Sequence, residues 1–205
     1  MFPDFLENPS DVAAPLLLGC TLTRTITLNG EKHKLVARIV ETEAYDQDDP
    51  ASHAFGGLSE RNAAMFGPAG HLYVYVSYGM HHCCNVVCGP EEFGSGCLVR
   101  AVEPLEGVEV MRELREAGRA GKEQAERARK HPLKLRDLTN GPGKVCAALG
   151  IDKELYGHDL TVEPLVLEFA PLLPGETIGC SPRVGISKNA DEIGRASCRE
   201  RVFRA

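Results

Sequence analysis

The sequence contains no tryptophan, and aromatic residues make up only 6% of its 205 positions. It also has no apolar run that approaches the ~20 residues of a membrane-spanning helix. The first five residues, Met-Phe-Pro-Asp-Phe, lack the basic segment that opens a secretory signal peptide. From these absences we expect a soluble, cytoplasmic protein with no membrane partner.

A disulfide framework is also missing, because the eight cysteines form no Cys-x-x-Cys pair and show no spacing typical of a small secreted domain. We therefore expect reduced thiols. The run His81-His82-Cys83-Cys84 raises the alternative of a metal site or a Cys–His nucleophile. On a strand, however, Cys83 and Cys84 point to opposite faces and cannot easily bind one ion. We expect no metal, and a metal-dependent hydrolase is kept only as an alternative.

The composition fits one globular domain, with 25% charged and 43% hydrophobic residues. Residues 192–202 read Glu-Ile-Gly-Arg-Ala-Ser-Cys-Arg-Glu-Arg-Val, which looks like the in-frame translation of a common sequencing adapter. We expect a single domain over residues 1–191, with its C-terminal strand truncated, and a non-native tail over 192–205. The alternative is a short basic C-terminal helix.

The net charge is negative over the whole chain. Residues 193–205 contribute +3 to the total of −6, so residues 1–192 carry −9. This balance argues against a protein that coats nucleic acid, but it leaves room for a local basic face. Such a face is available in the charged segment 122–136, which is otherwise a solvated helical surface.

Hydrophobic periodicity and turn residues predict strands joined in hairpins, with most helices later in the chain. Asn29-Gly30, the strongest short hairpin signal, separates the first two strands. The predicted strands cover residues 21–28, 32–45, 71–78, 83–88, 97–103, 160–169 and 183–186. The predicted helices cover 10–18, 104–119 and a segment ending at 149, and residues 46–70 form a long loop. We expect an α+β fold, a single mixed α/β domain with an antiparallel sheet core and flanking helices.

The stretch Ile39–Tyr45 contains the most informative pattern, Ile-Val-Glu-Thr-Glu-Ala-Tyr. Strand alternation places Ile39, Glu41, Glu43 and Tyr45 on one face. Two carboxylates and an aromatic ring on one face could hold a general base beside a flat ligand. An edge strand with two solvated glutamates is an equally open interpretation.

A second hairpin carries aromatic residues. Tyr73 and Tyr75 share one face, and Tyr78 lies next to the tip at Gly79-Met80-His81-His82. Aromatic residues on a sheet are usually ordinary packing, but an exposed one at a tip could enter a base stack and kink a duplex. Gly-Pro-Gly-Lys144 opens a helix, where backbone N–H groups and an ammonium suit an anion. Together these features suggest an enzyme that acts on an extruded base, as one candidate among several.

The order of the motifs resembles the alkyladenine (3-methyladenine) DNA glycosylase family, in a compact bacterial-type form. The similarity runs from about Leu16 to Ile186. The motifs that carry it are Val-Glu-Thr-Glu-Ala-Tyr, Asp-Pro-Ala-Ser-His, Arg-Asn-Ala-Ala-Met-Phe, Tyr-Val-Tyr-x-x-Tyr-Gly-Met-His-x-Cys-x-Asn, Leu-Val-Arg-Ala-Val-Glu-Pro-Leu-Glu-Gly and Gly-Pro-Gly-Lys. The resemblance implies a base-excision repair enzyme that flips and hydrolytically removes alkylated purines from duplex DNA. The expected bases are 3-methyladenine, 7-methylguanine and hypoxanthine, and no cofactor is expected.

The resemblance also assigns roles to residues. Glu43 matches the general base that activates water, and Arg100 matches a residue near that water and the flipped nucleotide's phosphate. The expected substrate-binding residues are Tyr45, His53, Tyr75 and Asn85, of which Asn85 crowds the 2-amino group of guanine. The residues expected to intercalate, on a protruding hairpin, are Tyr78, Met80 and His81. The expected contacts to the DNA backbone are Arg61 and Lys144.

The sequence departs from the family pattern in places. Ser59-Glu60 stands where related sequences commonly have Thr-Pro, so we expect a different DNA-facing loop. The acidic net charge predicts weak, strongly salt-dependent non-specific binding to DNA. We expect a monomer that acts on double-stranded DNA with a damaged purine, associated with the nucleoid. The alternative from another class is a catalytically weak protein that binds damaged nucleic acid.

Overall fold

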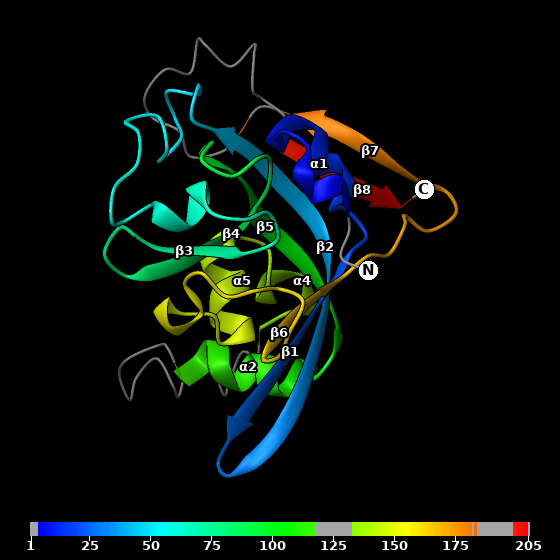
Figure 1. Ribbon diagram of the computed structural model, residues 1–205. Coiled ribbons are helices and arrows are strands. Elements are labelled where there is room, and N and C mark those ends of the chain that lie inside the picture. Colours follow the sequence, from blue (N-terminus) through cyan, green and yellow to red (C-terminus); the bar gives the residue numbers. More distant parts are fainter. Residues whose placement is uncertain (1–3, 118–132, 182, 184–198, 205) are drawn as a thin grey trace.

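The computed structural model describes residues 4–117, 133–181, 183 and 199–204, the last group as backbone. All its paired strands are antiparallel and lie in one curled sheet in the order β3-β4-β5-β2-β1-β6, to which β7 and β8 are attached through β2. The few helices pack around this sheet (Figure 1). The α+β class and the antiparallel sheet core are thereby confirmed.

The elements have the following bounds. The strands are β1 (Thr21–Leu28), β2 (Glu31–Asp46), β3 (Leu72–Ser77), β4 (His81–Val87), β5 (Ser95–Glu106), β6 (Leu165–Glu168), β7 (Glu176–Ser181) and β8 (Arg199–Arg204). The α-helices are α1 (Ser10–Leu16), α2 (Val108–Ala117), α4 (Leu135–Leu138) and α5 (Pro142–Leu149), and the 3-10 turns are η1 (Asp4–Glu7), η2 (Ala63–Phe66) and η3 (Lys153–Leu155).

Strand β2 is the central element of the sheet. One edge pairs with β5 along most of its length, and the other edge pairs first with β1 and then, at Glu41–Glu43, with β8. The β1–β2 hairpin turns at Asn29-Gly30, where both residues have positive φ, and its end extends past the helices (Figure 1). This hairpin was predicted from its turn signal alone, and the structure confirms it.

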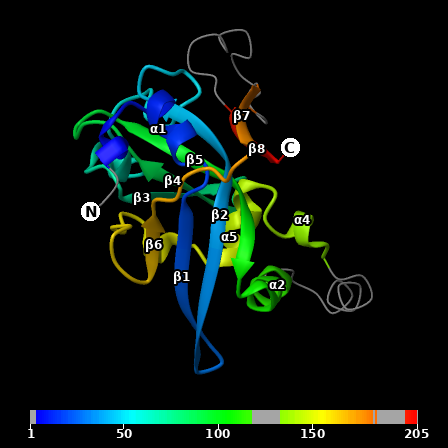
Figure 2. The same cartoon turned by 90° about the vertical axis from the view of Figure 1, so that its right-hand side faces the viewer.

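One hydrophobic core lies between the sheet and the helices. Helices α2, α4 and α5 gather along one side of β2, and α1 lies near its other end (Figure 2). The fully buried side chains include Leu17 beside α1, Ile39 of β2, Met111 of α2 and Leu149 of α5. A smaller cluster of Ala54, Met65, Tyr73 and Val87 lies under the loop that follows β2.

Two matched irregularities in β2 and β5 change which side chains face this core. Ile39 pairs with Val102, Glu41 with Ala101 and Thr42 with Val99, so Val40 and Arg100 are each an extra residue. Such bulges reverse the alternation of faces beyond them.

The reversal is visible in the burial of β2. Before the bulge Ile39 belongs to the core, and after it Ala44 does, while the Thr42 hydroxyl donates to Ala14 O of α1 at 2.9 Å. The expectation that Ile39 shares a face with Glu41 and Glu43 is therefore wrong, because strict alternation was assumed through a bulge.

Several predicted boundaries also differ. The helix expected from Pro104 begins at Val108, because β5 continues to Glu106 and Gly107 makes the turn at φ 76°. The strand expected over 160–169 is limited to β6. Most of the basic segment 122–136 and residues 184–186 of the last predicted strand lie outside the described residues.

The division into a domain and a tail stays a prediction. Residues 199–204, inside the predicted tail, form β8 between β2 and β7. Of the helices that the structure describes, none is long and apolar enough to cross a lipid bilayer.

Candidate active site

Glu43 lies in the second half of β2, and its side chain is buried, with 1% exposed. Arg100 of β5 approaches it, with Nε at 3.3 Å from Glu43 Oε1 and at 3.0 Å from Glu41 Oε1. The Tyr45 hydroxyl donates to Glu43 Oε2 at 2.8 Å. Arg100 Nε and the Tyr45 hydroxyl are both hydrogen-bond donors, and the oxygens of the Glu43 carboxylate accept from them. The two bulges create this arrangement, since they turn Glu41, Glu43 and Arg100 away from the core.

Tyr45 is held from both sides. The Arg183 guanidinium lies over its ring at 4.6 Å from the centroid, in cation–π contact. Arg183 forms a buried ion pair with Asp49 and donates to Ala44 O at 3.3 Å. Burial, and then the negative charge of Glu43, raise the pKa of Tyr45. The hydroxyl therefore stays protonated near neutral pH and remains a donor to Glu43.

His53 and Tyr75 form a second group of rings. His53 lies in the loop after β2 and Tyr75 in β3, and their ring centroids are 4.5 Å apart at 79°. Partial burial, and then the charge of Arg61, lower the pKa of His53, which favours its neutral imidazole. Burial raises the pKa of Tyr75, with further contributions from Cys83 and Tyr45.

The loop around His53 is held by one buried carboxamide. Asn62 accepts a hydrogen bond from Ser59 N at 2.7 Å and donates to the carbonyl oxygens of His53 and Gly57, each at 2.9 Å. These bonds fix the main chain on both sides of the loop. Arg61, immediately before Asn62, is thereby held near His53.

A row of side chains crosses four strands on the face of Glu43. Tyr73 pairs with Asn85, Asn85 with Leu98, and Leu98 with Glu43. Directly opposite residues of antiparallel strands point to the same face. Asn85 is buried, with 4% exposed. The predicted binding residue Asn85 and the predicted base Glu43 are therefore on one surface, with the aromatic group at the other end of the row.

The turn between β3 and β4 is shorter than expected. Tyr78 and Gly79 both have positive φ, at 50° and 69°, and Met80 N donates to Ser77 O at 3.2 Å, which describes a type I′ turn. Tyr78 is 86% exposed and Met80 is 74% exposed. A bulky residue in this backbone region is uncommon and costs free energy. The turn therefore presents two large apolar side chains to solvent.

A hollow of about 550 Å³ lies between this hairpin and the start of α5. Its lining includes Met80, His81 and Lys144, and also Arg115 of α2. The contact between the hairpin and α5 is close, since a Cβ on Gly143 would lie 3.0 Å from His81 Cβ. Three predicted DNA-contacting residues thus border one concave, locally basic surface.

Comparisons with known proteins identify the family of this chain. A sequence model of the family described as methylpurine-DNA glycosylase (MPG) matches residues 4–201. A relative from Nitrosospira multiformis, provisionally named a 3-methyladenine DNA glycosylase, is 44% identical over 92% of this chain and 84% of its own. Relatives with the same name from Chlorobaculum parvum and Agrobacterium fabrum are 47% and 48% identical, over 92% and 75% of this chain and 82% and 69% of their own. The chain belongs to the methylpurine-DNA glycosylase family. It is accordingly a DNA N-glycosylase, an enzyme of DNA repair.

With the family established, nine of the eleven predicted site residues fall into three groups, and Asn85 lies in the row of side chains on the face of Glu43. Glu43, Arg100 and Tyr45 are in direct contact, and His53 and Tyr75 are in contact with each other. The third group lies on the β3–β4 hairpin and at the start of α5, and it consists of Tyr78, Met80, His81 and Lys144. Arg61 lies on the loop and acts on His53.

The sequence did not reveal two supporting groups. Arg183 and its partner Asp49 support Tyr45, although 134 residues separate them and no motif links them. Tyr73 was noticed on the hairpin, but its hydroxyl contacts His53 at 3.0 Å, which its spacing does not show.

The cysteine and histidine run does not build a ligand set. Within the described residues, no three His, Cys, Asp or Glu side chains converge as metal ligands would. Cys84 belongs to the main core, whereas Cys83 contacts Tyr75 and has its pKa raised by burial to about 11. The two thiols thus lie on opposite faces of β4, as expected.

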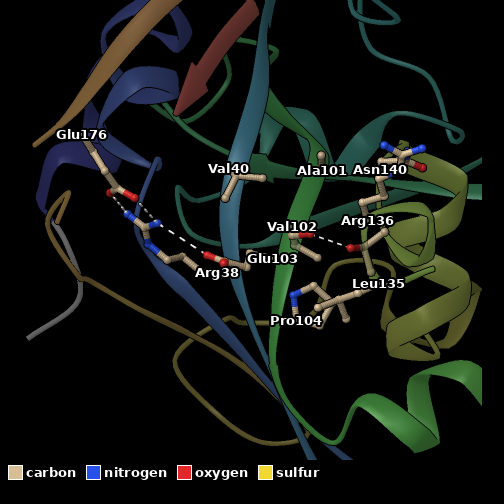
Figure 3. Close-up of a pocket in the computed structure, with 11 residues that line it drawn as sticks. Arg38, Val40, Ala101, Val102, Glu103, Pro104, Leu135, Arg136, Asn140 and Glu176 are labelled. Carbon is tan, nitrogen blue, oxygen red and sulfur yellow. Dashed lines mark hydrogen bonds and ion pairs between the residues drawn. The ribbon is translucent and has the colours of Figure 1, made fainter. Parts of the chain in front are cut away.

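A separate hollow of about 400 Å³ lies beside the bulge, between β2, β5 and α4 (Figure 3). Val40, the extra residue of β2, lines it together with Ala101. At its edge Arg38 pairs with Glu176 and, at 3.8 Å, with Glu103 (Figure 3). None of the predicted catalytic, binding or DNA-contacting residues lines this second hollow.

Proposed function

We propose that this enzyme removes 3-methyladenine, 7-methylguanine and hypoxanthine from duplex DNA by a hydrolytic reaction in which Glu43 activates water. The observation that carries the proposal is the buried Glu43 carboxylate, held between Arg100 Nε and the Tyr45 hydroxyl. A carboxylate positioned by two donors beside an aromatic group is suited to accept a proton from water next to a flat base.

The chemistry suits these residue types. An alkylated purine is cationic, so it leaves readily when the bond between its N9 (or the equivalent nitrogen) and C1′ breaks. The bonding electrons pass to the base, water forms the new bond to C1′, and Glu43 takes the proton that water loses. The negative charge of Glu43 also stabilises the positive charge that develops on the sugar. A positioned base contributes roughly 10²–10⁴-fold to the rate.

The aromatic side chains are suited to hold the base. We place the flipped purine between Tyr45 on one side and His53 with Tyr75 on the other. Electron-rich ring faces attract a cationic base. Asn85, on the same face as Glu43, is in position to crowd the 2-amino group of an undamaged guanine.

The exposed hairpin supports a role in opening the duplex. Tyr78 and Met80 are exposed apolar side chains at a turn, as a wedge between base steps requires. Lys144 at the start of α5, and Arg61 on the loop, are available for phosphates. We also propose that the enzyme acts as a monomer on DNA of the nucleoid.

The test compares Glu43→Gln with its neighbour. In excess chelator, wild-type protein with alkylated duplex should release free base. Glu43→Gln should bind the duplex with unchanged affinity and release base at least 10²-fold more slowly. Glu41→Gln is the matched control, since Glu41 also contacts Arg100 but has no assigned proton transfer, and it should retain most activity.

Three outcomes would contradict the proposal. Full activity of Glu43→Gln would remove its role as the base. Binding without base release by the wild type would favour a protein that only recognises damage. Release that stops on addition of chelator would favour metal-dependent hydrolysis.

A further inference from the structure

One face of the Tyr45 ring is covered by a cation. The central carbon of the Arg183 guanidinium lies 4.6 Å from the ring centroid. Arg183 is buried, with 9% exposed, whereas Tyr45 is only half-buried. The face toward Arg183 is therefore turned into the protein, and a base that stacks on Tyr45 must use the opposite face.

The Arg183 guanidinium is fixed in this place. Its Nη1 donates to Ala44 O at 3.3 Å and to Asp49 Oδ2. Asp49 Oδ1 in turn accepts from Ala51 N at 2.9 Å. Burial acts to lower the pKa of Arg183, but the hydrogen bond and the charge of Asp49 act in the opposite direction, and the pKa is raised overall. The guanidinium thus keeps its positive charge, and Asp49 is the buried carboxylate that compensates it.

A charge behind the ring acts on a base in front of it. The electron-rich ring attracts a cation on either face. Since Arg183 already occupies one face, a cationic base on the other face is attracted by the ring and repelled by the guanidinium. A base stacked there would lie about 8 Å from the guanidinium, and at an effective dielectric constant of about 20 two unit charges at that distance change an affinity on the order of tenfold. A neutral base is affected far less.

We propose that the Arg183–Asp49 ion pair sets the charge behind Tyr45, and that Asp49 thereby determines how tightly a cationic base binds relative to a neutral one. This inference rests on the proposed function, which places the flipped purine on Tyr45. Of the proposed bases, 7-methylguanine is cationic in DNA and hypoxanthine is neutral. With Asp49 in place the site accepts both. Arg183 and Asp49 act through Tyr45, so they are positioning residues that determine specificity.

The test measures equilibrium affinity in proteins that all carry Glu43→Gln, so that no base is released. Binding is the appropriate measurement, because the positive charge leaves the base as the bond to the sugar breaks. For each protein, the affinity for duplex with 7-methylguanine would be divided by the affinity for duplex with hypoxanthine. Undamaged duplex gives the reference for specific binding.

The expected shifts of this ratio have opposite signs. Asp49→Asn leaves Arg183 charged and should lower the ratio on the order of tenfold. Arg183→Gln leaves the charge of Asp49, which still accepts from Ala51 N, and should raise the ratio. The double variant has neither charge and should return to the ratio of the starting protein. Loss of packing alone would weaken both duplexes alike and would be largest in the double variant.

A second buried ion pair supplies the controls. Arg38 and Glu176 pair with side chains 6% and 3% exposed, beside the hollow of Figure 3 and apart from Tyr45. Arg38→Gln and Glu176→Gln should leave the ratio unchanged, whatever their effect on stability. Asp49→Asn leaves a buried cation uncompensated and can prevent folding, which circular dichroism would detect. Arg183→Gln and the double variant then carry the test.

The outcomes separate this inference from the proposed function. A ratio that is unchanged in the single variants, that moves in the same direction in both, or that stays shifted in the double variant would overturn the role of the ion pair alone. A Glu43→Gln protein that binds neither damaged duplex more tightly than undamaged duplex would contradict the proposed function, and this inference with it.

Discussion

Tyr45 contacts the proposed catalytic base, and it is also a proposed binding residue for the flipped purine. Its hydroxyl donates to Glu43, and its ring rests on the Arg183 guanidinium. A ring held at both its edge and its face loses little conformational freedom when a base stacks on it. Arg183 can play this part because Asp49 neutralises it in a buried environment, where an unpaired charge would be costly. A single proposed stacking residue thus depends on Glu43 of its own strand, on Asp49 in the loop that follows, and on Arg183, which lies 134 residues beyond Asp49.

A testable consequence at this scale concerns the protonation of His53. Partial burial, and then the charge of Arg61, lower the pKa of His53 in the folded protein. As the pH falls, His53 is therefore protonated at a higher pH in the unfolded chain than in the folded protein. The stability due to neutral His53 is present above its unfolded pKa of about 6.5 and is lost as pH falls through the folded pKa. Arg61→Gln should raise the pKa of His53 part of the way toward its ordinary value, because burial remains. NMR titration of the His53 ring signals measures this.

Arg136→Gln provides the control for that titration. Arg136 is an exposed arginine of α4 that pairs with Asp137 and has no contribution to His53. It should leave the His53 titration unchanged. A His53 pKa that is the same in Arg61→Gln and in the wild type would contradict the assigned electrostatic effect.

At the scale of elements, the bulges in β2 and β5 explain where sequence reasoning succeeded and where it failed. The Asn29-Gly30 hairpin was predictable because its turn geometry depends on two adjacent residues. The extra residues Val40 and Arg100 were not, because a bulge is defined by how two strands pair and not by either strand alone. The shared face of Glu41, Glu43 and Tyr45, which all follow the bulge, was predicted correctly, and Ile39 before the bulge was assigned to the wrong face.

Contacts between distant segments were likewise beyond local patterns. The motifs led to Glu43 and Tyr45, but nothing near Asp49 indicates Arg183 as its partner. The contact between the Tyr73 hydroxyl and His53 could not be predicted, because His53 lies 20 residues away in a loop. Residue types and motif order therefore predicted the candidate site, whereas the interactions that orient it required the fold.

At the β3–β4 turn, Tyr78 lowers the stability of the fold but supplies the side chain of the proposed wedge. Tyr78 has φ 50°, a conformation that asparagine adopts more readily than tyrosine. Tyr78→Asn should raise the free energy of unfolding by about 0.5–1 kcal/mol and weaken binding to damaged duplex. Urea denaturation and a binding titration on the same samples measure the two effects.

Met80→Asn is the matched control for the turn, because Met80 is also exposed but is not among the residues with positive φ. It should leave the free energy of unfolding unchanged. A Tyr78→Asn protein that binds and releases base as the wild type does would remove Tyr78 from the proposed wedge. A loss of stability would contradict the strain inferred at the turn.

At the scale of the whole molecule, an acidic chain must bind an acidic polymer. The net charge of −6 opposes binding at long range, so attraction depends on the local cations near the hairpin and α5. The hollow between these elements is lined by Arg115 and Lys144, and Lys144 Nζ donates to Asn140 Oδ1 at 2.6 Å. A lysine oriented at the start of a helix adds to the positive end of the helix dipole there. We expect each such phosphate contact to make binding depend on salt.

Lys144→Gln tests this view of DNA binding. Each phosphate neutralised by the protein contributes a slope of about −0.9 to a plot of log K against log salt concentration. The variant should therefore bind damaged and undamaged duplex more weakly by a similar factor, with a slope reduced in magnitude by about 1. Lys34→Gln is the control, because Lys34 is exposed on the distant β1–β2 hairpin and pairs with Glu106. An unchanged slope in Lys144→Gln, or an equal change in Lys34→Gln, would show that binding follows total charge and not the surface between the hairpin and α5.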